Sequence, residues 1–572
     1  MSDTDPNVKR QCVCDLVLGY CGEGYGENNC TAAIGTTGAD YCYRTRGTCQ
    51  DVVNFDKTAS GATTKTYRLA LANGPRMPGI QAWYVLDGVT VAPARLDDKR
   101  GLGGISDVSI QASGFYDDDA AQDPYRSLRS KVFEAPFFAR LIQRNPHYRG
   151  DSVVLREGTL EADGSADVDN WDTRTYVLDS FKESPDGKVK ITAKDGLTSL
   201  LTTVMPAPVS VELAASMTNV QTTATVKSGQ GDTLGTPTYW IKVDDEIMKV
   251  TARTGDGLTT IVRAQAGSSA ETHDADAKVT KGRVWEAASL DTVWADMLTD
   301  SGLVAAQIDT TGAATEVAYV AGGLSFTAYL FDELKAAEWM RILMRSGNAF
   351  TWWDPVAAKV KLKTVRPRAL GETATTITEG THIAMGSVGV ELLEDGAYTR
   401  GSIYLAPKDW SQDLEDADNY SRRVVYIDAV EEAAYGAIRE KPPTFAPFAP
   451  ASQFTEMESR IYREISRFIR PARRVVLDLA LRDASGLDLG DDVDLTTSKM
   501  VDDTGAAVLK ECRVTKIAYP RDGGIRYGYE METTQAEGKW GQWTDDTGTQ
   551  LTRWSDDDGF LADGYTPGWR WV

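Results

Sequence analysis

Residues 474–481, Arg-Val-Val-Leu-Asp-Leu-Ala-Leu, decide how the last part of the chain folds. From position 475 onward every second residue is Val or Leu, so these side chains lie on one face of a β-strand. The turn Leu489-Gly490-Asp491-Asp492 follows, and Val493-Asp494-Leu495 continues the alternation. A strand with one apolar face needs a sheet and a core beneath it, which predicts a β domain here.

A helix is predicted just upstream of this strand. Met457, Ile461, Ile465 and Phe468 recur at helical spacing and form one buried stripe. The Pro-rich residues 440–451 come before the helix and are typical of a connector between domains. The helix and the strand therefore belong to one late domain.

Strand patterns recur towards the N-terminus. Asp87-Gly88 and Asp186-Gly187 are each flanked by short runs rich in β-branched and aromatic residues. An Asp-Gly pair between such runs predicts a β-hairpin. Two helices are expected further on, over residues 290–303 and about 329–346. The fold class is therefore multidomain and mainly β, with some α.

The chain is long enough for about three to five domains. Shifts in composition divide it into six expected parts. These are a Cys-rich metal or cluster module (1–55), a first β domain (56–208), an inserted small β module (209–283), a second α+β region (284–440), a late domain of helix plus β barrel (441–535) and a Trp/Asp-rich C-terminal arm (536–572).

The charge balance and the histidines exclude several functions. Lys and Arg total 61 against 83 Asp and Glu, a net charge of −22, which argues against binding nucleic acid by neutralising phosphates. An acidic channel wall would instead let DNA slide past without specific binding. Only His147, His273 and His382 are present, so a catalytic histidine is not expected.

Neither a secretory signal nor a membrane span is expected. The first ten residues are polar, and the sequence contains no run of about 18 apolar residues. We therefore expect the protein to be made in a cytoplasm, where disulfides are disfavoured.

Six of the seven cysteines fall within residues 12–49, in a Gly-rich segment with few apolar residues. Such a segment cannot form a sufficient hydrophobic core and needs disulfides or a bound metal to stabilise its fold. The chemistry stays open between disulfides, a structural zinc and an iron–sulfur cluster. Zinc sites usually contain close Cys-x2-Cys pairs, which are missing here, whereas widely spaced cysteines suit a cluster.

Several segments together resemble the baseplate hub proteins of long-tailed, siphovirus-like phages and gene transfer agents. They are residues 189–197 (Val-Lys-Ile-Thr-Ala-Lys-Asp-Gly-Leu), residues 474–493 and the small module at 239–279. The resemblance implies β-barrel-type hub domains and a virion protein assembled in the host bacterial cytoplasm. It implies a homotrimeric tail-tip ring that continues and closes the tail tube, anchors fibres and opens for DNA release. The implied partners are the distal tail, tape-measure and tail fibre proteins, with the host cell surface as a further contact.

The spacing Cys21-x8-Cys30-x11-Cys42-x6-Cys49 is similar to the C-terminal cysteine domain of the lambdoid tail-tip protein L. That resemblance implies a [4Fe–4S] cluster held by these four cysteines. The middle gap is shorter here and Cys12 and Cys14 are extra, which leaves the identity of the four ligands open.

Two other functions are kept as alternatives to a non-enzymatic hub. One is an iron–sulfur redox enzyme, although no nicotinamide or flavin motif accompanies the cysteines. The other is a glycan-binding or glycan-cleaving tail protein, because the tryptophans of residues 536–572 could stack on sugars or contact a neighbouring subunit.

Overall fold

The structure is a computed structural model. It describes residues 9–534 except 23–24, 27–28, 33–40, 57–62, 97–100, 105, 121–122, 124, 129–133, 162, 210, 320–324, 367, 369–371, 394–396, 469–471, 481–485, 503 and 520–525. In the C-terminal arm it describes only strands β31 (Trp540–Gln542) and β32 (Trp569–Trp571), which pair with each other. The proposed role of the arm lies outside the described residues. The expected fold class, multidomain and mainly β, is confirmed.

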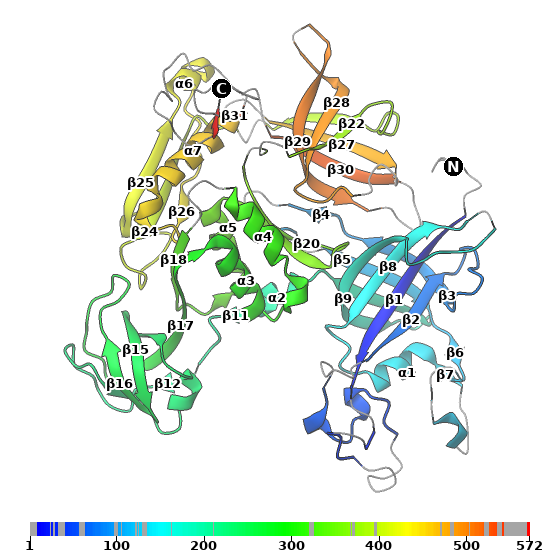
Figure 1. The fold of residues 1–572 in the computed structure, drawn as a ribbon, viewed down its shortest axis with the longest axis horizontal. Helices are drawn as coiled ribbons and strands as arrows, with labels where there is room; N and C mark the ends of the chain where they lie inside the picture. Colours follow the sequence, from blue (N-terminus) through cyan, green and yellow to red (C-terminus); the bar gives the residue numbers. More distant parts are fainter. Residues whose placement is uncertain are drawn as a thin grey trace.

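A closed seven-stranded barrel forms the N-terminal domain (Figure 1). Its strands follow the order β1-β2-β3-β5-β10-β9-β8, and only β2 and β3 run parallel. Alternate side chains of every strand fill the interior. The strands are β1 (Arg10–Tyr20), β2 (Thr63–Leu71), β3 (Trp83–Val91), β5 (Asp107–Ser113), β8 (Ser152–Thr159), β9 (Asp172–Glu183) and β10 (Lys188–Lys194).

Two expectations are corrected by this barrel. Residues 10–20 are not part of a separate cysteine module, because β1 pairs with both β2 and β8 and buries its side chains in the barrel. Asp87-Gly88 does not turn the chain either: it lies within β3, where the register against β5 shifts. Glycine is common at such a bulge as well as in a turn. The hairpin at Asp186-Gly187 is confirmed as the link from β9 to β10.

Helix α1 (Phe137–Arg144) covers one end of the barrel, next to the cysteine loops (Figure 1). Its Phe137, Phe138 and Leu141 are buried in the barrel core. The connection that leads to it carries the short strands β6 (Tyr116–Asp117) and β7 (Ala135–Pro136), which pair with each other. This end of the barrel is where the candidate site lies.

The inserted module forms most of a seven-stranded sheet, in the order β12-β17-β14-β15-β16-β13, and β18 (Ser325–Leu330) also pairs with β17. It docks on the loop that follows β24, where Gly267 (φ +91) lies so close to Lys408 that a Cβ would be 1.8 Å from the Lys408 carbonyl oxygen. The ring of Tyr329 contacts both Trp410 and the module's Trp240, with ring centroids 5.6 and 5.1 Å apart. The module strands are β12 (Val211–Glu212), β13 (Ala224–Thr225), β14 (Tyr239–Val243), β15 (Glu246–Thr254), β16 (Gly257–Val262) and β17 (Lys278–Ser289).

A buried carboxylate organises this module. Glu246 accepts hydrogen bonds from Arg263 Nε (2.6 Å) and the Ala264 and Glu271 amides (3.0 Å each), and its Oε2 lies 3.0 Å from His273 Nε2. Burial alone would raise the pKa of Glu246, but these bonds outweigh it and lower the pKa to about 2. His273 is therefore part of a structural network, which also includes Asp244.

Glu246→Gln is expected to destabilise the inserted module by about 3–5 kcal/mol at pH 7, because it leaves the buried Arg263 without its carboxylate. The folded pKa is lower than the ordinary 4.5, so the stabilisation is complete above pH 4.5 and is lost as the pH falls towards 2. Denaturant unfolding of the wild type and the variant should therefore converge at low pH. Glu271→Gln, whose side chain is exposed, is the control and should have little effect at pH 7. An equally stable Glu246→Gln protein would contradict the prediction.

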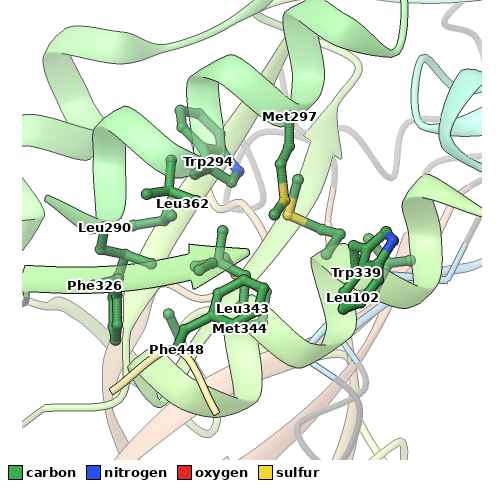
Figure 2. Close-up of a cluster of buried hydrophobic side chains, with 14 of the residues drawn as sticks. Leu102, Leu290, Trp294, Met297, Phe326, Trp339, Leu343, Met344, Leu362 and Phe448 are labelled. Atoms are coloured by element: carbon green, nitrogen blue, oxygen red, sulfur yellow. The ribbon is translucent and has the colours of Figure 1, made fainter. Parts of the chain in front are cut away.

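The middle of the molecule is helical and holds the largest apolar core (Figure 2). Trp294, Met297, Phe326, Trp339 and Leu343 meet there. The elements are α2 (Thr198–Thr202), β11 (Val204–Met205), α3 (Leu290–Asp300), α4 (Thr310–Ala318), β18 (Ser325–Leu330), β19 (Leu334–Lys335), α5 (Ala336–Gly347), β20 (Ala349–Asp354) and β21 (Lys359–Thr364).

The helix expected from about residue 329 begins later. Residues 325–330 form β18, which pairs with β17, so α5 starts at Ala336. Pairing with β17 keeps the first residues of the expected helix, 329 and 330, in a strand. In the described part of the chain, no helix is long and apolar enough to cross a membrane.

The last β domain is a sheet in the order β22-β28-β29-β30-β27-β23. β27 and β28 therefore share a sheet but are not neighbours, because β29 and β30 lie between them. The strands are β22 (Thr375–Thr378), β23 (Gly389–Leu393), β27 (Ala472–Ala480), β28 (Asp492–Val501), β29 (Ala507–Ala518) and β30 (Arg526–Thr533).

A separate small sheet lies beside the expected late helix, which is confirmed as α7 (Phe454–Phe468). The sheet has the order β25-β24-β26, and α7 packs on β24 and β25. Its elements are β24 (Arg400–Pro407), β25 (Tyr420–Ile427), α6 (Ala429–Tyr435) and β26 (Thr444–Ala446).

The barrel and the last sheet are joined by main-chain bonds. β4 (Ala94–Arg95), from the connection between β3 and β5, pairs with β29. The Leu96 amide then donates to Thr515 O (2.8 Å). A segment of the first domain thus adds a strand to the last one.

The β20–β21 hairpin makes a second bridge. Trp353 Nε1 donates to Thr175 O in the barrel (3.0 Å), whereas Lys361 Nζ donates to Asp488 Oδ2 in the last domain (3.1 Å). Trp352 Nε1 also donates to Asp488 (3.3 Å). The hairpin and β4 thus both link the barrel to the last β domain.

Candidate metal centre

The cysteine loop begins where β1 leaves the barrel. The Cys21 amide donates to Arg44 O (2.8 Å), and the Gly22 amide donates to Asp56 O (3.1 Å). These bonds join the start of the loop to residues 44 and 56 and bring Cys21 next to the segment that carries Cys42. The first of the four predicted ligands is thereby tied to the third.

A second set of bonds ties the segment of Cys30 to that of Cys49. The Thr31 amide and hydroxyl both donate to Asp51 Oδ2 (2.6 and 2.9 Å). Tyr25 Oη donates to Gln50 Oε1 (2.9 Å). These bonds hold the segment that contains Cys30 beside the segment that contains Cys49.

Burial and neighbouring thiols raise the pKa of two of the four cysteines, Cys42 and Cys49. Burial is the first cause that raises the pKa of Cys42, and the thiols of Cys30 and Cys21 raise it further, against a hydrogen bond from the Arg44 amide. Burial likewise raises the pKa of Cys49, together with Cys42, Cys21 and Cys30 and against a hydrogen bond from the Asp51 amide. A cationic centre bound beside Cys42 and Cys49 would lower both pKa values and stabilise their thiolates.

The remaining three cysteines lie elsewhere. Cys12 and Cys14 point into the barrel core and are fully buried. Burial, with Cys12 and Asp15, raises the pKa of Cys14 well above its ordinary value. Cys512 is buried in the last sheet, where its pKa is raised to about 12, chiefly by burial. All seven cysteines lie in the described part of the chain, and none of them forms a disulfide there.

The described part of the cysteine loop does not present a preformed site for a single metal ion. Among the described residues, no group of three or more His, Cys, Asp or Glu side chains is placed to hold one metal ion. A single zinc would need its sulfurs about 3.8 Å apart, given Zn–S bonds of about 2.3 Å in a tetrahedron. A [4Fe–4S] cluster places each thiolate on a different iron and so accepts a wider arrangement. The Arg44 amide donates to Cys42 Sγ (3.4 Å), a bond that also suits a cluster thiolate.

The sequence also contains two acidic triplets, and neither the histidines nor the first triplet, Asp117-Asp118-Asp119, forms a metal site among the described residues. His147 is exposed, and His382 Nδ1 accepts from the Thr378 amide (3.1 Å). Asp118 pairs with Arg126, and Asp119 pairs with Arg140 and Arg144. The second acidic triplet, at residues 556–558, lies outside the described residues.

One residue that contacts the cysteine loop was not predicted from the sequence. Tyr125, about 80 residues away in the chain, donates from its hydroxyl to the carbonyl oxygen of Cys42 (2.7 Å). No motif surrounds Tyr125 in the sequence, so only the fold brings it to the cysteines.

No protein-family model matches this sequence, and no curated protein matches it either. The structure is similar to solved structures of phage tail and secretion-system proteins. The 43 kDa tail protein of prophage MuSo2 from Shewanella oneidensis is 9% identical, with a TM-score of 0.37, over 78% of this chain and 98% of that one. A tail protein from Neisseria meningitidis is 8% identical, with a TM-score of 0.37, over 78% and 96%.

A third similar structure is an Escherichia coli component of the type VI secretion system, itself described as similar to the T4 bacteriophage tail proteins gp27 and gp5. It is 7% identical, with a TM-score of 0.31, over 80% of this chain and 75% of that one. All three TM-scores are below 0.5, so the proposal that follows is built on this chain's own residues.

Proposed function

We propose that the protein is a structural, non-enzymatic hub of a phage tail tip, which forms part of a ring that continues and closes the tail tube. One observation carries this proposal: a closed barrel and a second β domain are fused by main-chain pairing between β4 and β29. A ring that bears load during attachment and DNA release needs such rigid neighbouring β units.

The remaining parts of the proposal extend the resemblance found in the sequence. The resemblance implies that the ring is a homotrimer, and a closed ring around a channel has cyclic symmetry. It contacts the distal tail, tape-measure and tail fibre proteins, assembles in the host cytoplasm and remains in the virion. DNA passes through without specific binding, in keeping with the net charge of −22.

We further propose that Cys21, Cys30, Cys42 and Cys49 hold a [4Fe–4S] cluster. When bound, the cluster supplies four strong iron–thiolate bonds that hold together a loop of few apolar residues. The proposal is supported by the two sets of hydrogen bonds across the loop, which hold the segments that carry these cysteines beside one another. The role is structural, and no electron transfer is assigned to it.

The test is electron cryomicroscopy of the assembled particle, with an antibody fragment against this chain. The expected result is three copies in one ring at the tail tip, around the bore. A single copy, a dimer or a position away from the tail would overturn the proposal. Turnover of a small substrate or binding on a glycan array would favour the redox or glycan alternatives instead.

A further inference from the structure

We propose that Tyr125 is a positioning residue for the cysteine site, which fixes the backbone at Cys42, one of the residues that would hold the cluster. This inference rests on the proposed cluster. It concerns a residue of the connection between β5 and α1, outside the cysteine loop itself. It assigns this connection a role that the cysteine spacing does not reveal.

The contacts of Tyr125 converge on one short segment. Its hydroxyl donates to Cys42 O (2.7 Å). Its ring stacks on Tyr41, with centroids 4.9 Å apart, and meets the edge of Tyr43 at 5.6 Å. Tyr125 thus holds Cys42 together with both of its neighbours, which lie on either side of the proposed ligand.

Cys42 is therefore held at two atoms. Its carbonyl oxygen accepts from Tyr125, and its Sγ accepts from the Arg44 amide (3.4 Å). Fixing the carbonyl restrains the backbone dihedrals of Cys42, which set the direction of the Cα–Cβ bond and so of the sulfur. A ligand restrained in this way loses less conformational entropy when it binds iron.

Tyr125 is in turn anchored by Asp123. The Asp123 carboxylate accepts both from the Tyr125 amide (2.9 Å) and from Tyr43 Oη (3.1 Å). The same carboxylate oxygen therefore links the tyrosine to the cysteine loop. This arrangement fixes the ring of Tyr125 relative to the segment that it clamps.

The clamp, by which we mean Tyr125 and Asp123 with the residues 41–43 that they contact, is connected to helix α1 of the barrel domain. The guanidinium of Arg144, in α1, lies 3.9 Å from the centre of the Tyr43 ring and donates to Asp119 Oδ1 (3.1 Å). The Thr45 hydroxyl donates to the carbonyl oxygen of Arg144. Loss of the clamp should therefore loosen the cysteine loop on the barrel without disturbing the barrel core.

The test compares Tyr125→Phe with Tyr116→Phe in the full chain. Tyr116 lies in the same connection but is 71% exposed, so it is a matched control. With iron loaded anaerobically, the Tyr125→Phe protein should lose its visible absorption to an iron chelator about fivefold faster than the wild type, the effect of one lost hydrogen bond. The control should match the wild type.

A second readout uses metal-free protein. Alkylation of Cys42 by iodoacetamide, followed by peptide mass spectrometry, should be faster in Tyr125→Phe, while Cys49 in the same molecules provides the reference. Equal alkylation ratios and equal chelator rates in both variants would overturn the role of Tyr125 while leaving the cluster intact. A wild type that binds no iron would overturn the cluster proposal and, with it, this inference.

Discussion

Changing Cys42 to Ser should abolish iron binding, giving a colourless protein where the wild type is brown with about four irons per chain. Cys42 is a proposed ligand whose sulfur and backbone are both held in place. Serine keeps the shape but binds iron–sulfur clusters poorly because its oxygen is a harder ligand. The measurements are visible absorption and iron quantification after anaerobic purification.

Cys512→Ala is the control for this prediction. Cys512 is also a buried thiol, but it lies in the last sheet, so the variant should keep the full iron content. Cys49→Ser should behave like Cys42→Ser. A wild type that contains zinc instead of iron, or whose thiols react only after a reductant is added, would show that the site has a different chemistry.

Trp294→Ala should destabilise the middle of the molecule by about 3–5 kcal/mol. Trp294 is fully buried at the centre of the largest core (Figure 2). Its Nε1 donates to Thr351 Oγ1 (3.0 Å), and the Thr351 hydroxyl in turn donates to Lys361 O (2.7 Å). The substitution therefore leaves a large cavity and removes a bond between α3 and the hairpin that bridges the two β domains.

A chain with several domains does not unfold in one step, so the effect is best measured by hydrogen exchange. The amides of α3 and β20 should exchange at least about 100-fold faster in Trp294→Ala, which corresponds to about 3 kcal/mol. Val356→Ala is the control, because Val356 is 65% exposed in the turn of the same hairpin. Unchanged protection of α3 in Trp294→Ala would contradict the assignment of this core.

The sequence predicted elements well where their periodicity reflected a single buried face. The strand at 472–480 and the helix at 454–468 were both predicted from alternating or helical spacing. Prediction from the sequence failed where pairing with a strand distant in the chain decided the local structure. Asp87-Gly88 became a bulge because β3 continues along β5, and residues 325–330 became a strand because β17 lies beside them.

The cysteine site shows the same division. The composition of residues 12–49 indicated a segment that needs a staple, and the spacing proposed four ligands. Tertiary structure placed Cys12 and Cys14 in the barrel core, because β1 lies between β2 and β8 and alternate side chains of β1 point into the barrel. The spacing of cysteines along the chain does not show which of them will lie in a strand of a closed barrel.

By itself, the sequence determined the mainly β class, the acidic charge and the four candidate thiols, because each depends on composition or on contacts between near neighbours. Only the tertiary structure decided that β4 joins the barrel to the last sheet and that Tyr125 reaches Cys42. Both are contacts between segments far apart in the chain. Their energies depend on the geometry of the whole fold, which no local pattern records.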